Sequence, residues 1–455
     1  MSGNAGLAVL VLAAGKGTRM RSKRTKVLHE ICGQPMLAYP LAAAAQLGAD
    51  KLVVVIGRDA DQVEAAFAGR AQFAVQSEQR GTGHAVQVAL PKLGDFRGDV
   101  LVLYGDSPLL RPESIARMRA RKTETGAALV MLTSPEPLPG RVVRGADGRV
   151  ERIVEQTDAT PEELTIREGN TGVYLCDSAL LASAVAALAP KNAQGELYLT
   201  DVVAIARARG LAVEAIQLDD ADEALGVNTR AELARAAAVQ RRRNVEAHMA
   251  RGVTFIDPAN VYVDTGVEIG RDTQIDPGVM ITGPTRIGEG VHIKAHCVIE
   301  SSVLDDDVVV GPSAHLRPGS RLASGVRIGN FVEVKNSVLG RGVKADHLAY
   351  IGDADVGEDA SFGCGAITVN YDWEKKHRTT VGERVRIGCN ANLIAPITLE
   401  SDSYVAAGTT ITKTVPTDAI AVSTGRQKNL EGWGKKRRKS GGSGTGGGHT
   451  GSEHS

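Results

Sequence analysis

One group of residues near the N-terminus has the types and spacing to bind a polyphosphate. The apolar run 8–14 is followed by the string GKGTRM at residues 15–20. A Gly-rich turn after a buried strand can direct backbone N–H groups at phosphate oxygens. Because Met20 stands where a dinucleotide fingerprint has its third glycine, the string matches neither that motif nor a Walker A loop. Taken alone it favours a plain tight turn, but the nearby cations Arg19 and Lys26 could neutralise a triphosphate.

A carboxylate further along the chain occupies a position typical of ligand sites. The apolar stretch from Val100 to Tyr104 ends in Gly105-Asp106. In α/β folds, ligands bind at the carboxyl ends of the strands, and Mg²⁺ prefers oxygen ligands together with substrate phosphates. Asp106 is therefore a candidate Mg²⁺ ligand, and the alternative is an ordinary turn or helix-capping aspartate.

A second group of residues, in the C-terminal half, combines cations with a histidine. It comprises Arg317 in HLRPG, Lys335 in NFVEVKN, His347 and Tyr350 in ADHLAYIGD, and Asn370, Tyr371 and Lys376 in NYDWEKK. Arginine and lysine suit phosphate recognition, and a histidine, which ordinarily titrates near pH ~6.5, can accept a proton at neutral pH. Singly, each cation is equally a solvated surface residue, and a lone histidine is more often structural.

Alternating strands and helices must position the first group. From about residue 7 to 228, short apolar runs that read as buried strands (8–14, 52–56, 100–104 and 127–132) are separated by Ala-rich helical patterns. This alternation predicts an α/β domain, Rossmann-like, with a mixed but mostly parallel sheet. The segment 229–251 contains no Pro or Gly and is dense in Ala, Arg, Glu and Leu. It predicts one long helix that links two domains.

A repeat of period six positions the second group. Branched apolar residues recur every six residues from Val263 to Ile299, from Leu304 to Val334 after a slip of one residue, and from Ile387 to Ile411. Period six fits neither a helix nor an isolated hairpin sheet, and is the signature of a left-handed parallel β-helix of hexapeptide repeats. Each inward apolar residue would lie on one short strand, and three hexapeptides would close one triangular coil.

These patterns divide the chain into four predicted segments. They are an α/β domain over 1–228, a linker helix over 229–251, a β-helix domain over 252–437 and a disordered Gly- and Ser-rich tail over 438–455. Between Val334 and Ile387 the repeat is looser, and the string NYDWEKKHRT breaks it. We expect a loop that leaves the coil on the ligand-binding face.

Composition narrows the partners and the compartment. The 455 residues contain 53 Lys and Arg against 53 Asp and Glu, so nothing suggests nucleic acid or an anionic membrane as a partner. No stretch approaches the ~18 apolar residues of a membrane span, and no basic residue precedes the N-terminal apolar run, as it would in a signal peptide. The five cysteines are scattered without a CxxC pair, which favours reduced thiols and a cytoplasmic protein.

The first group of residues resembles the nucleotidylyltransferases that activate sugar-1-phosphates. The resemblance rests on LAAGKGTRM, Lys26-Val27-Leu28, Tyr104-Gly105-Asp106 and shorter matches as far as Gly226-Val227-Asn228. It is closest to the bifunctional N-acetylglucosamine-1-phosphate uridylyltransferase / glucosamine-1-phosphate N-acetyltransferase family. This implies that 1–228 is a uridylyltransferase (pyrophosphorylase) domain of the nucleotidyltransferase fold and that 252–437 is an N-acetyltransferase domain. It implies that Asp106 and Asn228 hold Mg²⁺ and that Arg19 and Lys26 are catalytic cations. The other residues that it implies in nucleotide and sugar binding are Leu12, Ala13, Ala14, Gly15, Gln76, Gly81, Thr82, Tyr104, Gly105, Gly140, Glu155 and Asn170. Of these, Gln76 and the Gly81-Thr82 turn would hold uracil, and Gly140, Glu155 and Asn170 would hold N-acetylglucosamine.

The second group resembles the acetyltransferase domain of the same family. The resemblance implies that His347 accepts a proton from the sugar amine as the amine attacks the acetyl-CoA thioester. It implies sugar-phosphate binding by Arg317, Lys335, Tyr350, Ser361 and Lys376, and acetyl-CoA binding by Cys364, Asn370, Tyr371, Cys389, Ala407 and Thr424. Ser361, Cys364, Cys389 and Thr424 differ from the residues that the family often carries, which bears on the affinity for acetyl-CoA.

The resemblance covers nearly the whole chain, from Leu7 to about Trp433, and implies one overall activity. Acetyl-CoA would acetylate glucosamine-1-phosphate, and UTP would then convert N-acetylglucosamine-1-phosphate to UDP-N-acetylglucosamine, a precursor of peptidoglycan and lipopolysaccharide. We expect Mg²⁺ as cofactor, small molecules as partners, and a homotrimer, because a single prism gives its ligand groups no second wall. The alternatives are a sugar-1-phosphate nucleotidylyltransferase with a purely structural β-helix and a scaffold without catalysis.

Two cysteines allow opposite interpretations. Cys364 lies in a Gly-Cys-Gly corner, and Cys389 follows Ile387-Gly388 at another corner. Corner residues of a β-helix point outward, which predicts exposed thiols beside the coenzyme A groove. A free cysteine is, however, commonly a small, buried and inert filler.

Overall fold

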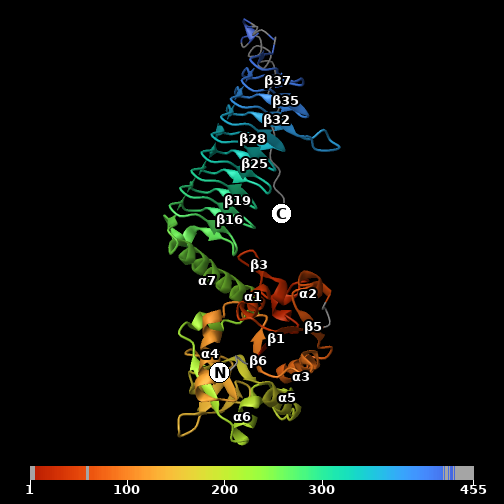
Figure 1. Ribbon diagram of the computed structural model, residues 1–455, viewed down its shortest axis with the longest axis vertical. Coiled ribbons are helices and arrows are strands. Elements are labelled where there is room, and N and C mark those ends of the chain that lie inside the picture. The colour runs from red at the N-terminus through yellow and green to blue at the C-terminus, as the bar shows by residue number, and fades with distance from the viewer. Residues whose placement is uncertain are drawn as a thin grey trace, which may run out of the picture.

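The computed structural model describes residues 6–57, 61–423, 425, 429, 431–433 and 435. Figure 1 shows a domain of sheet and helices, joined by one long helix to a tall stack of short strands. The α/β domain, the linker helix and the β-helix that the sequence predicts are present in that order. The predicted tail and Thr424 lie outside the described residues, and the boundaries of the four segments stay a prediction.

A nine-stranded sheet forms the centre of the first domain. Its order is β11-β7-β10-β6-β1-β4-β5, and an arm made of β8 and β9 pairs with β10. The pairs β1–β4, β1–β6, β4–β5 and β7–β11 are parallel, whereas β10 is antiparallel to both of its neighbours. The strands are β1 (Leu7–Ala13), β4 (Lys51–Ile56), β5 (Gln72–Val75), β6 (Asp99–Tyr104), β7 (Leu129–Ser134), β8 (Gly140–Arg144), β9 (Val150–Glu155), β10 (Gly169–Asp177) and β11 (Val213–Gln217). The predicted mixed, mostly parallel sheet is confirmed.

Helices cover both faces of this sheet. Ala8, Leu10 and Leu12 of β1 belong to one apolar cluster, while Val9 and Val11 belong to another. Successive strand residues point to opposite faces, so burial on both sides explains why these strands are apolar throughout. The helices are α1 (Ala38–Gln46), α2 (Asp61–Ala66), α3 (Thr82–Leu93), α4 (Pro112–Thr125), α5 (Ser178–Ala186) and α6 (Asp201–Ala208), with 3₁₀ turns η1 (Thr18–Met20), η2 (Lys26–Leu28), η3 (Glu163–Thr165) and η4 (Ala221–Ala224) and a hairpin of β2 (Glu30–Ile31) and β3 (Gln34–Pro35). In the described ranges, the structure contains no helix that is long and apolar enough to cross a membrane.

The linker helix α7 (Arg230–Met249) is fixed at both ends. At its start, the Thr229 side chain accepts a hydrogen bond from the Glu232 amide, and the Glu232 carboxylate accepts one from the Thr229 amide, which forms a capping box. Near its end, Val245 joins the apolar core of the β-helix, and Asn244 Nδ2 donates to the carbonyl of Val263 at 3.0 Å. The helix therefore closes the open end of the β-helix while it is anchored in the first domain.

The β-helix has three faces on which every third strand stacks in parallel. The first face contains β12 (Thr254–Phe255), β15 (Gln274–Ile275), β18 (His292–Ile293), β21 (Val309–Val310), β24 (Arg327–Asn330), β27 (Lys344–His347), β30 (Ser361–Phe362), β33 (Arg386–Ile387), β36 (Tyr404–Val405) and β38 (Ile420–Ala421). The second face contains β13 (Tyr262–Val263), β16 (Met280–Thr282), β19 (Val298–Glu300), β22 (His315–Leu316), β25 (Glu333–Lys335), β28 (Tyr350–Gly352), β31 (Ile367–Val369), β34 (Asn392–Ile394) and β37 (Thr410–Ile411). The third face contains β14 (Glu268–Ile269), β17 (Arg286–Ile287), β20 (Val303–Leu304), β23 (Arg321–Leu322), β26 (Val338–Leu339), β29 (Ala354–Val356), β32 (Thr379–Val381) and β35 (Ile397–Leu399). The turn η5 (Pro258–Asn260) lies in the first coil.

The residues at period six form the core of this stack, as the sequence predicts. The looser segment between Val334 and Ile387 is more regular than expected, since Leu339, Ile351 and Phe362 continue the same buried ladder. Only residues 370–378, between β31 and β32, depart from the stack (Figure 1). The predicted loop is thus confirmed. The repeat is looser in the sequence because alanine and phenylalanine, as well as branched residues, take the inward position.

Candidate active sites

The ammonium group of Lys26 lies at the centre of the first site. Its Nζ atom donates to Asp106 Oδ2 at 2.5 Å and to Asn228 Oδ1 at 3.0 Å. The Lys26 side chain is 8% exposed, so this ion pair is largely shielded from water. The Lys26 side chain can pack against the backbone at Gly17 because this residue is a glycine. A Cβ atom on Gly17 would lie only 2.7 Å from Lys26 Cβ.

Backbone contacts between distant segments bring Asp106 and Asn228 together. Strand β6 pairs with β1, and the Gly105 amide donates to the Leu12 carbonyl at 2.9 Å directly beyond the pair. The Val227 amide then donates to the Asp106 carbonyl at 2.8 Å. The Asn228 amide donates to Glu232 Oε2 at 2.7 Å, so the start of α7 fixes the position of Asn228.

The two oxygen ligands of this site fit a magnesium ion that is held mainly by substrate phosphates. The side-chain oxygens of Asp106 and Asn228 already converge on one cation, the Lys26 ammonium. A carboxylate and an amide oxygen are donors that Mg²⁺ accepts, and Mg²⁺ usually binds through one or two carboxylates plus phosphate oxygens. In the part of the chain that the structure describes, no group of three or more His, Cys, Asp or Glu side chains is placed to hold a metal ion. Phosphate oxygens and water would complete the coordination.

A cavity of about 230 Å³ adjoins Lys26. It is lined by the predicted Leu12, Ala13, Ala14, Gly15, Lys26, Gln76, Gly81, Thr82, Tyr104 and Asp106, and by Val27, Gln79, Ala85 and Glu196, which the sequence did not single out. Gln76 is buried, and its Nε2 donates to the Gly81 carbonyl at 3.1 Å. Burial, followed by the charges of Asp106 and Glu155, raises the pKa of Tyr104 above its ordinary value, so its phenol stays neutral.

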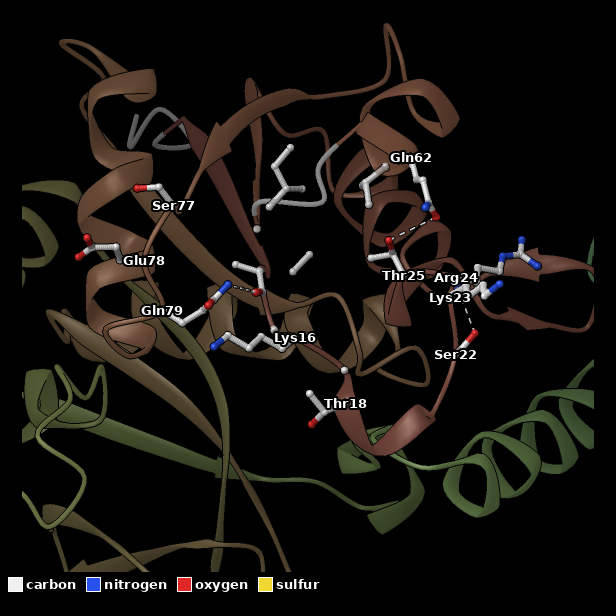
Figure 2. A pocket seen from close by; sticks show the side chains of 17 residues that line it. Lys16, Thr18, Ser22, Lys23, Arg24, Thr25, Gln62, Ser77, Glu78 and Gln79 are labelled. Carbon is white, nitrogen blue, oxygen red and sulfur yellow. Dashed lines mark hydrogen bonds between the residues drawn. The ribbon is translucent and has the colours of Figure 1, made fainter.

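A larger and more basic cavity of about 920 Å³ adjoins the same Gly-rich turn (Figure 2). It shares Ala13, Ala14, Gly15 and Gln79 with the smaller cavity, and its cationic lining is Lys16, Lys23 and Arg24. Lys23 and Arg24 were not predicted as site residues, although the density of basic residues from 16 to 24 was a signal. The predicted Arg19 is exposed on η1 and is absent from the lining of both cavities.

The residues predicted to hold the sugar lie together where the arm of the sheet meets β10. Gly140 and Glu155 are opposite each other in the β8–β9 pair. A Cβ atom on Gly140 would lie 3.2 Å from Asn170 Cβ, and Asn170 Oδ1 accepts a hydrogen bond from the Tyr174 hydroxyl at 3.0 Å. Burial raises the pKa of Glu155, and the negative charges of nearby acidic residues raise it further. Tyr174 was not identified from the sequence, because it belongs to no motif.

In the β-helix, three cations gather where the second face ends. Arg317 follows β22, Lys335 ends β25 on the next coil, and Lys376 comes from the projecting loop. Contact with Lys376, and then partial burial, lowers the pKa of Lys335. Arg317 Nη1 donates to Glu333 Oε1 at 2.8 Å. Like charges held this close favour an anion between them, and a phosphate would suit.

The loop that carries Lys376 is braced by its own hydrogen bonds. Asp372 Oδ1 accepts from the amides of Glu374 and Lys375 at 2.9 and 2.7 Å, and Asp372 Oδ2 lies 2.6 Å from His377 Nε2. The Lys375 amide and then His377 hold the pKa of Asp372 well below its ordinary value. The loop is therefore held together from within. An isolated antiparallel β-bridge between the backbones of Tyr371 and Lys376 brings Lys376 back toward the β-helix.

A buried aspartate missed by the sequence analysis organises the same region. Asp353 Oδ2 accepts from Asn370 Nδ2, and Asp353 Oδ1 accepts from Asn336 Nδ2, each at 2.5 Å. The Asn370 amide also donates to the Tyr350 hydroxyl at 3.3 Å. Asn370 is thus buried beside the cations, whereas Tyr371 is half exposed at the base of the loop.

The remaining predicted residues lie at the corner between the first and second faces. His347 ends β27, and its Nδ1 is 3.0 Å from Asn330 Oδ1 on the preceding coil. Cys364, Cys389 and Ala407 follow β30, β33 and β36 at the equivalent corner position, so they continue the ladder of His347. Ser361 points outward from the first face. Within one chain, His347 and the cations therefore occupy the two opposite edges of the second face.

The fold and these two clusters define a two-domain transferase, a nucleotidyltransferase followed by a hexapeptide-repeat acyltransferase. A family model described as a MobA-like NTP transferase domain matches residues 9–207. Models described as bacterial transferase hexapeptide (six repeats) and hexapeptide repeat of succinyl-transferase match residues 266–301 and 378–413.

Curated proteins named bifunctional protein GlmU match nearly the full chain. The relative from Pelobacter propionicus is 47% identical over 455 residues, which cover 95% of this chain and 99% of the relative. The relative from Geobacter sulfurreducens is 45% identical over 471 residues with the same coverage, and that from Mycolicibacterium vanbaalenii is 44% identical with 95% and 93% coverage. The chain belongs to the GlmU family of bifunctional proteins, and its nucleotidyltransferase domain is of a metal-dependent type.

Proposed function

We propose that this GlmU family member makes UDP-N-acetylglucosamine in two steps at two separate sites. The observation that carries the proposal is the presence, in one chain, of two separate polar clusters, each centred on lysine. One is Lys26 between Asp106 and Asn228, and the other is Lys335 with Lys376. Each would receive a phosphorylated sugar or nucleotide.

In the uridylyl step, the phosphate oxygen of N-acetylglucosamine-1-phosphate attacks the α-phosphorus of UTP in line, and pyrophosphate leaves. Lys26 and Arg19 would stabilise the charge on the phosphates, and the sheet arm with Glu155 and Asn170 would orient the sugar. Gln76 and the Gly81 turn would hold the uracil. When bound, Mg²⁺ at Asp106 and Asn228 would neutralise phosphate charge.

In the acetyl step, Arg317, Lys335 and Lys376 would hold the phosphate of glucosamine-1-phosphate. With Asn330 Oδ1 as the acceptor, His347 Nδ1 would carry the proton and Nε2 would be left as an acceptor. Nε2 would take the proton of the sugar amine as the amine attacks the acetyl-CoA carbonyl and coenzyme A leaves as a thiol. Tyr350 and Ser361 would contact the sugar phosphate. The corner residues Cys364, Cys389 and Ala407, the neighbouring Asn370 and Tyr371, and Thr424 would contact acetyl-CoA.

A homotrimer would complete the second site. His347 and the cations lie at opposite edges of one exposed face, so a second prism in a cyclic assembly would supply the missing wall. Light scattering should give a trimeric mass at micromolar concentration. A monomeric mass with intact acetyl transfer would contradict this part of the proposal. We also place the reaction in the cytosol, where the five free cysteines would stay reduced.

One assay separates this proposal from its alternatives. UTP, acetyl-CoA, glucosamine-1-phosphate and Mg²⁺ are supplied together, and thiol and pyrophosphate release are followed separately. Release of both supports the bifunctional enzyme. Pyrophosphate release only when N-acetylglucosamine-1-phosphate is supplied, without thiol release, would indicate a structural β-helix, and release of neither would indicate a scaffold.

A further inference from the structure

The five cysteines of the chain fall into two classes. Burial is the largest cause that raises the thiol pKa of Cys32 to about 11 and of Cys176 to about 12, and it also raises the pKa of Cys297. These thiols stay protonated and unreactive near neutral pH. Cys364 and Cys389 are exposed, as one of the two sequence interpretations predicted.

The two exposed cysteines occupy equivalent positions on adjacent coils. Phe362 pairs with Ile387 in the β30–β33 ladder, so Cys364 and Cys389 each lie two residues beyond a paired inward residue. The backbone stays in register past them, because the Asn390 amide donates to the Cys364 carbonyl at 2.8 Å. The next residue is left-handed in both corners, with φ 77° at Gly365 and 54° at Asn390. The two corners are therefore the same turn, repeated.

Identical turns in register place the two thiols side by side. Neighbouring strands of a sheet are about 4.8 Å apart, and a disulfide spans Cα atoms about 4.4–6.8 Å apart and Cβ atoms about 3.5–4.5 Å apart. The Cα separation expected for the stacked corners lies inside that range. The Cβ atoms need to approach by roughly 0.3 Å, which a small shift of the corner backbone can supply. Rotation of the two exposed side chains about χ1 then turns the sulfur atoms toward each other.

We propose that Cys364 and Cys389 form a vicinal dithiol that a small-molecule disulfide converts into an intrachain disulfide. One thiolate attacks the reagent RSSR, forms a mixed disulfide and releases one RS⁻. The second thiolate attacks the protein sulfur of the mixed disulfide, forms the Cys364–Cys389 bond and releases the second RS⁻. Two protein thiols are oxidised, the reagent is reduced to two thiols, and a dithiol reductant reverses the exchange.

The consequence for catalysis rests on the proposed function. The proposed acetyl-CoA site runs along the corner that begins at His347. A disulfide between two adjacent coils at that corner would narrow the space in which acetyl-CoA binds. Oxidation should then abolish thiol release and leave pyrophosphate release intact, because the uridylyl site lies in the other domain. Acetyl-CoA that is present beforehand should slow formation of the disulfide.

The test treats the full chain with oxidised glutathione and maps the thiols by mass spectrometry under non-reducing conditions. The expected product has lost two hydrogen atoms and contains one peptide pair joined through Cys364 and Cys389. Cys364→Ser and Cys389→Ser should instead each stop at the mixed disulfide with glutathione. Cys32→Ser, which removes a thiol elsewhere, should give the same joined peptides as the wild type.

Three results would overturn the inference: both cysteines unmodified after long exposure, both carrying glutathione, or a disulfide between two chains on a non-reducing gel. The mapping does not depend on activity. If the disulfide-linked peptides form while release of coenzyme A is unchanged, the disulfide between Cys364 and Cys389 is supported. That result would also show that these corners do not belong to the acetyl-CoA site.

Discussion

Replacing Gly17 by alanine should slow the proposed uridylyl step by displacing Lys26. Gly17 has φ 61°, a conformation that costs an alanine roughly 1–2 kcal/mol. The new Cβ would also lie 2.7 Å from Lys26 Cβ, whereas ordinary contacts begin at 3.4 Å. The lysine must therefore withdraw by 0.7 Å, the difference between 3.4 and 2.7 Å. Misplacement of a catalytic group by about 1 Å can lower a rate by about 10²-fold.

The assay measures kcat for pyrophosphate release from UTP and N-acetylglucosamine-1-phosphate. We expect Gly17→Ala to lower this rate by about 10- to 10²-fold and to leave thiol release from acetyl-CoA and glucosamine-1-phosphate unchanged. Gly48→Ala is the matched control, because Gly48 has a similar φ of 68° and nothing within 4 Å of an added Cβ. It imposes the same backbone strain without the clash, so both rates should survive with a small loss of stability.

Equal pyrophosphate release by Gly17→Ala and Gly48→Ala, with equal losses of stability, would refute the reasoning. That result would mean that the position of the Lys26 ammonium between its two oxygen partners does not limit the reaction.

Three further predictions test individual groups. Asp106→Asn should abolish pyrophosphate release and spare thiol release, because the amide keeps the shape of the side chain but loses the charge that pairs with Lys26; a parallel loss of both activities would contradict two separate sites. His347→Ala should lower thiol release by about 10²–10⁴-fold. The control is His292→Ala, which removes a histidine on the same face that pairs with Asp276 and should leave thiol release unchanged. Near-normal acetylation by His347→Ala would show that His347 is not the general base. Burial raises the pKa of Glu155 above its ordinary value of 4.5. Between 4.5 and the raised pKa, the folded state binds more protons than the unfolded chain, so the stability of the protein falls as the pH rises through this range. Glu155→Gln should therefore resist urea better than the wild type at about pH 7 but not at about pH 4, and equal midpoints at both pH values would argue against a costly buried charge.

The periodic parts of this structure could be predicted from the sequence. A period of six allows one arrangement of the inward residues, so Ile275, Ile293 and their successors specify the core of the β-helix before any contact is known. Continuous apolar strands likewise indicate a sheet buried on both faces. The exception is the segment around Phe362, where Ala345 and Phe362 fill inward positions that the sequence pattern reserves for branched residues.

Contacts that depend on tertiary structure could not be predicted. Alternating strands and helices indicate a sheet but not that β6 lies beside β1, and this pairing is what brings Asp106 to Lys26. The approach of Lys376 to Lys335 depends on the hydrogen bonds of Asp372 inside a loop that no repeat describes. Asp353 belongs to no motif, and its role is visible only when Asn336 and Asn370 are seen on either side of it.

The way α7 closes the β-helix limits how the two domains can be separated. A stack of strands has an open end, where unpaired backbone groups and apolar side chains invite a second stack to add itself. Here Val245 covers the end of the apolar core, and Asn244 takes up the Val263 carbonyl. A fragment that begins at residue 252 would lose this cover and should associate end to end. A fragment that begins at residue 229 keeps the whole helix, so the end of its β-helix stays covered. This fragment should therefore not associate end to end.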